Sequence, residues 1–236
     1  MTDPLEGHTA KTLDGLLGEL RLSAVSMGGL VIDQVASSIN SLLEGDAALA
    51  ELVLSREVQV NDLERTVDRE AFRLIALHQP VAGDLRMAKA VSRITVELER
   101  AGDEAKKIAK FAVRLASGEP QGPVRAVARY LRHMAELTTG MLRDAVRALD
   151  ESDASMAQTV AARDSELDAE FAAALRQVLT LAMQDQRFLG ATIDTVFALK
   201  GLERIGDHAK NIAEQVVFVT SGEDVRHRRR SAGVTK

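Results

Sequence analysis

The sequence predicts an all-α protein made of two tandem three-helix bundles. A polar and apolar pattern that begins at Leu98 (LERAGDEAKKIAKFAV) returns at an offset of 104 residues, at Leu202 (LERIGDHAKNIAEQVVF). Both copies carry apolar residues at helical spacing. The composition agrees, with four prolines, 3% aromatic residues, no tryptophan, and no segment that alternates as a strand would. Two copies of one pattern in one chain indicate that a three-helix unit was duplicated.

The apolar residues of both copies follow alternating steps of three and four, which is the seam of a helix that packs against others. Gly102 and Gly206 lie at the same place on the flank of this seam. A glycine inside a helix costs about 1 kcal/mol relative to alanine, so we expect another helix to pass close to each. The seam residues are Val91, Ile94, Leu98, Ala101, Ala105, Ile108, Ala112 and Leu115, then Ala198, Leu202, Ile205, Ala209, Ile212, Val216 and Val219.

Three helices are expected in the first half of the chain. Apolar spacing predicts the first over residues 9–43, ended by Gly45, and the second over residues 46–78, with Asp46 as its N-terminal cap. Pro80 ends the second helix or opens the third, because proline is tolerated in a first turn and not inside a helix. The third helix ends near Ser117, where SGEPQGP reads as a linker.

The second half repeats this order, with helices expected over residues 124–149, 153–183 and 188–220. Arg56 matches Arg163 at an offset of 107, whereas Glu99 matches Glu203 at 104. The shorter offset implies a shorter connection between the second and third helices of this half. The sequence therefore divides into a first bundle over residues 9–117, a second over 123–220, and a basic tail over 221–236.

Charge and cysteine content exclude several functions. The net charge is −5, but the tail carries a balance of +3, which leaves the body at −8. A body this acidic is a poor partner for nucleic acid, and we expect the RHRRR tail to be disordered and solvated. The absence of cysteine excludes disulfides, thiolate metal sites and thiol catalysis.

The N-terminal stretch MTDPLEGHTAKTLDG lacks the basic start and apolar core of a signal peptide. We also find no run of about 18 apolar residues that would span a membrane. Together these observations predict a cytoplasmic protein.

The candidate functional residues are carboxylates. Glu99 and Asp103, and likewise Glu203 and Asp207, are spaced i, i+4, so each pair lies on one helix face. Like charges at this spacing repel by a few tenths of a kcal/mol. In one interpretation nearby lysines, such as Lys107 for Asp103, offset them on an ordinary solvated surface. In the other, each pair is half of a cation site, since oxygen ligands suit Mg²⁺, Ca²⁺, Mn²⁺ or iron.

The neighbouring helices offer the other half. Asp164 and Asp168 are spaced i, i+4, and Glu57 and Asn61 take the equivalent places in the first half. Because Asn61 has a neutral amide and Lys107 brings a positive charge near, we expect tighter metal binding in the second half. We call Glu57, Asn61, Glu99 and Asp103 the first acidic site. We call Asp164, Asp168, Glu203 and Asp207 the second acidic site.

Other chemistry has little support in the sequence. There is no HExxH, no Glu-x-x-His, no P-loop and no GxGxxG, so a zinc protease, a ferritin-type oxidase and a nucleotide site lack their usual residues. His208 follows Asp207 and could reach a cation or titrate near neutral pH. A solvent-facing position is the favoured interpretation of this histidine.

Several stretches together resemble the PhoU family of phosphate transport accessory proteins. They are LERAGDEAKKIAKF, LERIGDHAKNIAEQVVF, SREVQVNDLE, HQPVAGDLR and ARDSELD, and the likeness covers residues 13–220. The resemblance implies two three-helix bundles in tandem, assembled as a homodimer. It also implies multinuclear surface clusters of iron or zinc held by acidic motifs, which correspond here to both acidic sites.

The function that the resemblance implies is regulatory and not catalytic. PhoU-like proteins couple the ATPase subunit of the high-affinity phosphate ABC transporter to a membrane sensor histidine kinase. They keep phosphate-starvation signalling off when phosphate is plentiful. Two alternatives remain open: a metal-dependent enzyme that uses the surface carboxylate clusters, and a purely structural bundle with solvated acidic faces and no metal.

Overall fold

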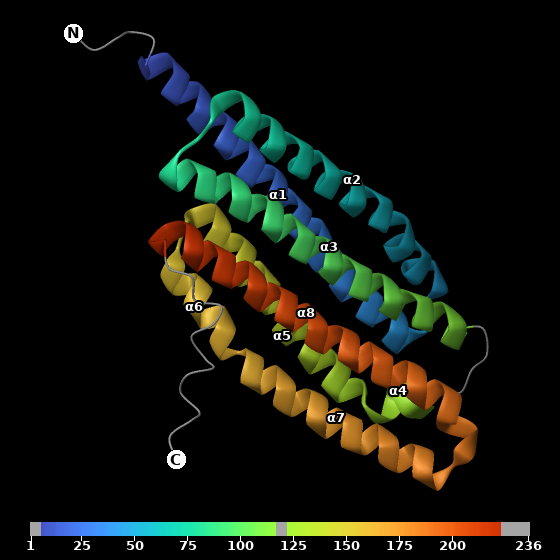
Figure 1. Ribbon diagram of the computed structural model, residues 1–236. Coiled ribbons are helices and arrows are strands. Elements are labelled where there is room, and N and C mark those ends of the chain that lie inside the picture. The colour runs from blue at the N-terminus through green and yellow to red at the C-terminus, as the bar shows by residue number, and fades with distance from the viewer. Residues whose placement is uncertain (1–5, 117–121, 223–236) are drawn as a thin grey trace, which may run out of the picture.

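The computed structural model describes residues 6–116 and 122–222, and these residues form helices joined by short turns. Two three-helix bundles lie side by side along their lengths (Figure 1). The first bundle contains α1 (Glu6–Glu44), α2 (Ala47–His78) and α3 (Ala82–Ala116). The second contains α4 (Gly122–Ala126), α5 (Ala128–Glu151), α6 (Ala154–Ala162), α7 (Asp164–Gln184), the 3₁₀ turn η1 (Gln186–Phe188) and α8 (Leu189–Ser221). The predicted all-α fold of two tandem bundles is confirmed, whereas most of the basic tail lies outside the described residues.

The helix starts follow the cap chemistry that the sequence predicts. The Asp46 side chain accepts a hydrogen bond from the Leu49 amide at 2.9 Å and so caps α2. Asp153, its counterpart in the second repeat, accepts from the amides of Ser155 and Met156 at 2.8 and 3.0 Å and caps α6. Each bond satisfies an amide that has no partner inside its own helix.

Two of the expected helices are interrupted. The helix expected over residues 153–183 breaks at Arg163, between α6 and α7, where the Arg163 guanidinium reaches Asp144 of α5 at 2.8 Å. The helix expected over residues 124–149 breaks at Val127, and the side-chain amide of Gln177 on α7 donates to the Ala126 carbonyl at 2.6 Å. Both breaks are held by contacts with a neighbouring helix, which the apolar spacing of a single helix does not reveal.

The glycines in the two repeated motifs mark close contacts between helices. A Cβ atom on Gly206 would overlap the side chain of Leu167 on α7. A Cβ on Gly102 would lie 3.2 Å from Gln34 Oε1 and 3.6 Å from Val60 Cγ1, on α1 and α2. The expectation that another helix passes close to each glycine is therefore confirmed.

The two bundles join along α3 and α8, which lie side by side in the middle of the molecule, and along α1 and α5 (Figure 1). At the second contact, Gly28 of α1 lies so close to Val146 of α5 that a Cβ there would come within 2.6 Å of it. Buried residues of both bundles form one continuous hydrophobic core. The helix α1 therefore contributes both to the core of the first bundle and to the interface with the second.

The helix α1 is the most apolar of the long helices by one measure. Over Thr12–Glu44 it is long and apolar enough to cross a membrane by length and composition alone, although the sequence has no uninterrupted run of about 18 apolar residues. Its buried side chains, among them Leu20, Met27 and Val35, pack into the core. One helix of this kind is weak evidence for a membrane span, and α1 packs against α2, α3 and α5.

Candidate functional site

The structure brings together three carboxylates of the first acidic site. Glu57 from α2 and Glu99 and Asp103 from α3 each offer one oxygen, and these oxygens all lie within 4.8 Å of one another. Glu57 is buried, and the other two are half-buried. Among residues 12–116 and 122–222, whose side chains are described, this is the one group of three acidic, histidine or cysteine residues that meets this distance.

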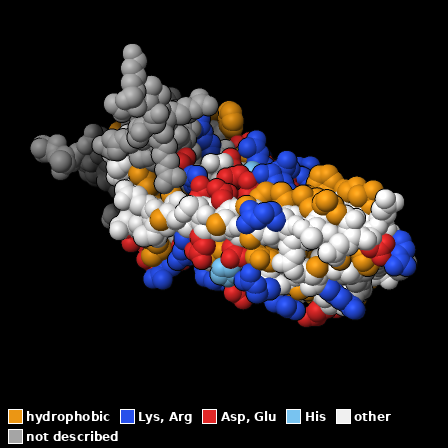
Figure 2. Space-filling view, turned by 90° about the horizontal axis from the view of Figure 1, so that it is seen from below, with side chains coloured by type: hydrophobic (Ala, Val, Ile, Leu, Met, Phe, Trp, Pro, Cys, Tyr) orange, Lys and Arg blue, Asp and Glu red, His pale blue; other side chains and the backbone are white. Residues whose placement is uncertain are grey.

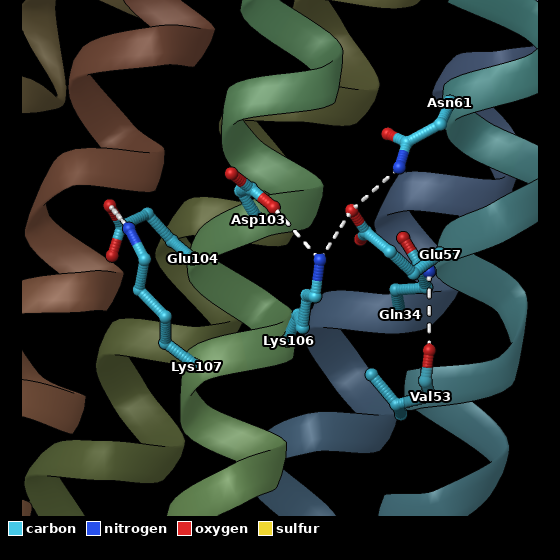
Figure 3. Close-up of polar contacts among 8 residues, drawn as sticks. All are labelled: Gln34, Val53, Glu57, Asn61, Asp103, Glu104, Lys106 and Lys107. Atoms are coloured by element: carbon cyan, nitrogen blue, oxygen red, sulfur yellow. Dashed lines mark hydrogen bonds and ion pairs between the residues drawn. The ribbon is translucent and has the colours of Figure 1, made fainter.

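A lysine occupies the space between these carboxylates. Lys106 extends from α3 toward α2, and its ammonium lies 3.0 Å from Glu57 Oε1 and 3.4 Å from Asp103 Oδ1 (Figure 3). The side-chain amide of Asn61 donates to the same Glu57 oxygen at 3.2 Å. Glu57 Oε1 thus accepts from two donors, one charged and one neutral.

Other oxygens of this site lack partners. Glu57 Oε2 and Asn61 Oδ1 are buried and accept no hydrogen bond. Burial raises the pKa of Glu99 above its ordinary value of 4.5, and the negative charges of Asp103, Glu64 and Glu57 raise it further. Electron-rich oxygens held close together without enough donors form an environment that attracts cations.

The second acidic site is arranged differently. Lys210 of α8 pairs with Asp164, the first residue of α7, and Lys200 pairs with Glu203 at 2.6 Å. Asp207 is exposed beside them, and its pKa is raised above 3.8 by desolvation and by the charges of Glu203 and Asp164. Asp164 of α7 and Glu203 of α8 thus each pair with a lysine of α8, and Asp207 lies close enough for their charges to raise its pKa.

Some sequence expectations for these sites need correction. Asp168 is exposed, and among the described side chains it belongs to no group of three possible metal ligands within 4.8 Å of one another. Lys107, expected near Asp103, instead donates to Glu104 at 2.8 Å, and Lys106 is the lysine that reaches Asp103. The charge that was expected to weaken the first acidic site thus comes from the residue before it.

The contact between α3 and α8 was missed in the sequence. His208, expected to face solvent, has a side chain only 17% exposed, and its Nδ1 lies 2.7 Å from Glu97 Oε2. Asn211 donates to the same Glu97 oxygen at 3.0 Å. Burial alone would raise the pKa of Glu97, but the hydrogen bonds from His208 and Asn211 and the charges of His208 and Arg100 outweigh it, so this pKa is lowered.

A second ion pair across the same contact joins Arg204 to Glu104 at 3.3 Å. Glu97 and Glu104 are seven residues apart, which places them on one face of α3. That spacing is the signal that could have indicated a polar contact with another helix. It does not reveal the partner, because α8 is about a hundred residues away in sequence.

The oxygen atoms that the acidic sites offer as ligands suit a hard cation. Carboxylate and amide oxygens are typical ligands of Mg²⁺, Mn²⁺, Ca²⁺ and iron, and Glu57 Oε2 is an available buried donor in the first acidic site. Zinc also accepts carboxylate ligands. Lys106 nevertheless places a positive charge at the position that a metal ion would take.

The surface of the molecule carries both charged and apolar side chains. On one face, acidic side chains gather in compact groups beside basic ones, and hydrophobic side chains extend along the molecule (Figure 2). Large apolar side chains are exposed near the ends of α2 and α7, including Phe72 at 73% and Met183 at 87% exposure. Exposed apolar patches on a folded protein are typical of surfaces that other proteins cover.

The PhoU domain model matches this chain twice, over residues 24–112 and 131–216. The chain belongs to the PhoU family. The two matched ranges correspond to the two bundles, each with its acidic site.

Known relatives match nearly the whole chain. The phosphate-specific transport system accessory protein PhoU homolog of Pseudomonas putida is 40% identical over 227 residues, 95% of this chain and 87% of that protein. The fold is similar to the crystal structure of PhoU from Pseudomonas aeruginosa, with a TM-score of 0.82, 38% identity, and coverage of 89% of this chain and 99% of that one. The phosphate transport system regulatory protein PhoU from Streptococcus pneumoniae gives a TM-score of 0.81 at 28% identity, covering 90% and 99%.

Proposed function

We propose that this protein is a phosphate transport accessory protein that represses phosphate-starvation signalling when phosphate is plentiful. The observation that carries the proposal is its relation to proteins named for this accessory role, at up to 40% identity over 95% of the chain. The role is regulatory and not enzymatic. It places the protein in the cytoplasm, as an adaptor at membrane complexes.

In this proposal the partners are the ATPase subunit of the phosphate ABC transporter and the cytoplasmic domains of a sensor histidine kinase, and the protein itself is a homodimer. Support comes from the exposed apolar side chains near the ends of α2 and α7, because a regulator without catalysis must act through protein contacts. Support also comes from the length of the helices, which offer extended faces for such contacts.

The acidic sites have a structural role in the proposed function. We propose that they bind metal ions, with iron or zinc as the first candidates and Mg²⁺, Mn²⁺ or Ca²⁺ as others. Glu57, Glu99 and Asp103 would hold the ion in the first repeat, and Asp164, Glu203 and Asp207 in the second. A bound cation would neutralise carboxylates on two helices at once and so fix α2 against α3 and α7 against α8.

Deletion of the gene tests the regulatory role. In the deletion strain, a phosphate-starvation promoter should be active in phosphate-rich medium, and the intact gene should restore repression. If the promoter stays off in the deletion strain, the protein is not a repressor of this response. Purification of the tagged protein from cells grown at high and low phosphate, with identification of bound proteins, tests the partners.

The Asp207→Ala variant in the same strain separates a functional acidic site from a solvated surface. If the site contributes to signalling, the variant restores repression less well than the intact gene at equal protein level. A purely structural bundle predicts full repression.

A further inference from the structure

Each acidic site contains a lysine at the same place in the repeat. Lys106 and Lys210 are related by the offset of 104, and their partners Glu57 and Asp164 by the offset of 107. Lys106 bonds to Glu57 and Asp103, and Lys210 pairs with Asp164. In both repeats, therefore, an ammonium from the third helix reaches a carboxylate of the second.

The neighbouring lysine does not share this arrangement. Lys107 pairs with Glu104 on its own helix, and its counterpart in the second repeat is Asn211. The repeated feature is thus specific to Lys106 and Lys210, and it is not a general enrichment of basic residues on this face.

Burial gives these ammonium groups a defined role. The Glu57 side chain is only 5% exposed, and its Oε2 has no partner even with Lys106 bound to Oε1. A buried carboxylate near two others is costly unless a positive charge compensates it. One ammonium supplies a single positive charge, so the carboxylates of the first acidic site remain undercompensated.

The two lysine side chains can also move away from the carboxylates that they contact. Lys106 and Lys210 are 30% and 22% exposed, so both reach solvent along their length. A lysine is a point charge on a flexible stem, and swinging it outward would not open the apolar core. A divalent ion could then bind the same oxygens with twice the positive charge of the ammonium group.

We propose that Lys106 and Lys210 are built-in counter-cations of the two acidic sites, and that a divalent cation binds each site by displacing the lysine ammonium. This inference rests on the metal sites of the proposed function. It explains how the sites fold without a bound ion. It also means that a metal ion must compete with the lysine ammonium for the same carboxylate oxygens.

The test measures Mn²⁺ binding by isothermal titration calorimetry with the full chain, as wild type, Lys106→Met, and Lys110→Met. Lys110 is an exposed lysine one turn further along α3, so its variant is a matched control for loss of one positive charge. We expect Lys106→Met to bind Mn²⁺ about tenfold more tightly than wild type, with Lys110→Met close to wild type. Equal affinity of wild type and Lys106→Met would overturn the proposal while leaving the metal sites in place.

Thermal unfolding provides the second measurement. In EDTA, Lys106→Met should unfold at a lower temperature than Lys110→Met, and added Mn²⁺ should remove the difference. A Lys106→Met protein that is folded only with Mn²⁺ also supports the proposal. A protein that unfolds alike in EDTA and Mn²⁺ contradicts it.

The Lys106→Arg variant retains the charge and should resemble wild type in both measurements. Lys210→Met should behave in the second repeat as Lys106→Met does in the first. If no variant and no wild-type protein binds Mn²⁺, the metal sites and this inference both fail, whereas the role in phosphate signalling is still decided by the deletion strain.

Discussion

The two acidic sites share one sequence register but compensate their charges differently. In the first, a single ammonium from Lys106 is shared by two carboxylates, and Glu57 is buried inside a continuous α2. In the second, Glu203 and Asp164 each pair with a lysine of their own, and Asp164 begins α7 after a break in the helix. Equivalent acidic positions in the two repeats therefore differ in burial and in charge compensation.

If the acidic sites bind metal as proposed, this difference predicts the opposite order of metal affinity from the one that the sequence suggested. The sequence favoured the second acidic site, because Asn61 and Lys107 weaken the first. In the structure Lys107 is engaged with Glu104, and the close group of three carboxylates lies in the first. A compact set of oxygens favours cation binding, so we now expect the first acidic site to bind more tightly.

The largest expected effect concerns the glycines next to the two sites. In Gly206→Ala the new Cβ would overlap Leu167, a core side chain that is 1% exposed, so we expect a loss of about 1–3 kcal/mol of folding free energy. In Gly102→Ala the nearest atom is the end of the Gln34 side chain, and the gain in helix propensity of about 1 kcal/mol offsets the closer contact.

Urea denaturation of both alanine variants against wild type measures these values. The comparison holds if Gly206→Ala is clearly the more destabilised of the two. A larger loss in Gly102→Ala would show that α2 packs as tightly in the first repeat as α7 does in the second.

A second effect concerns the polar contact between the bundles. Glu97 bonds to His208 and Asn211 on α8, whereas its counterpart in the second repeat is Gly201. We expect Glu97→Gln to cost about 1–2 kcal/mol at neutral pH, since hydrogen bonds to a charged group are lost. Glu136→Gln, at an exposed position of α5, is the control.

The pH dependence of this loss follows from the lowered pKa of Glu97. A carboxylate favoured in the folded state contributes its full stability above the ordinary pKa of 4.5, and this contribution is lost as the pH falls through the lower folded pKa. The difference between wild type and Glu97→Gln should therefore shrink below about pH 4.5. A difference that is constant from pH 7 to pH 3 would contradict the assignment.

A smaller effect tests whether neighbouring carboxylates repel one another in both acidic sites. The pKa values of Glu99 and Asp207 are raised, so their ionised forms are disfavoured in the folded state. The stability that they contribute should therefore decrease as the pH rises from the ordinary values through the raised ones. In EDTA at pH 7, Glu99→Gln and Asp207→Asn should each gain about 0.2–0.5 kcal/mol. Denaturation at pH 5 and pH 7 measures this gain, and a loss of stability at pH 7 in either variant would show that the carboxylate is stabilising.

The smallest effect is expected at Asp168. Because this side chain is exposed, Asp168→Asn should change the folding free energy by less than about 0.5 kcal/mol. Calorimetric titration with Mn²⁺ should give the same affinity as wild type, whereas Asp207→Asn should weaken binding in the second repeat. If both variants weaken Mn²⁺ binding equally, Asp168 is a ligand, and the second acidic site contains all four residues that the sequence predicted.

Contacts between residues close together in the chain could be predicted from the sequence, whereas contacts that depend on a distant helix could not. Glu99 and Asp103 could be paired from sequence, because residues four apart in a helix share a face. Their meeting with Glu57 could be inferred from the repeat register. The choice of Lys106 over Lys107 could not, because both lie within reach of Asp103 along the helix, and only the position of α2 selects between them.

The sequence by itself determined the helices, the duplication and the register of the acidic residues, since these follow from local periodicity and from comparison of the chain with itself. The tertiary structure alone decided the break at Arg163, the burial of His208 against Glu97, and the lysine that compensates each site. These features depend on which helices pack together at long range. No local pattern contains that information, because side chains select among nearby partners only after the backbones are in place.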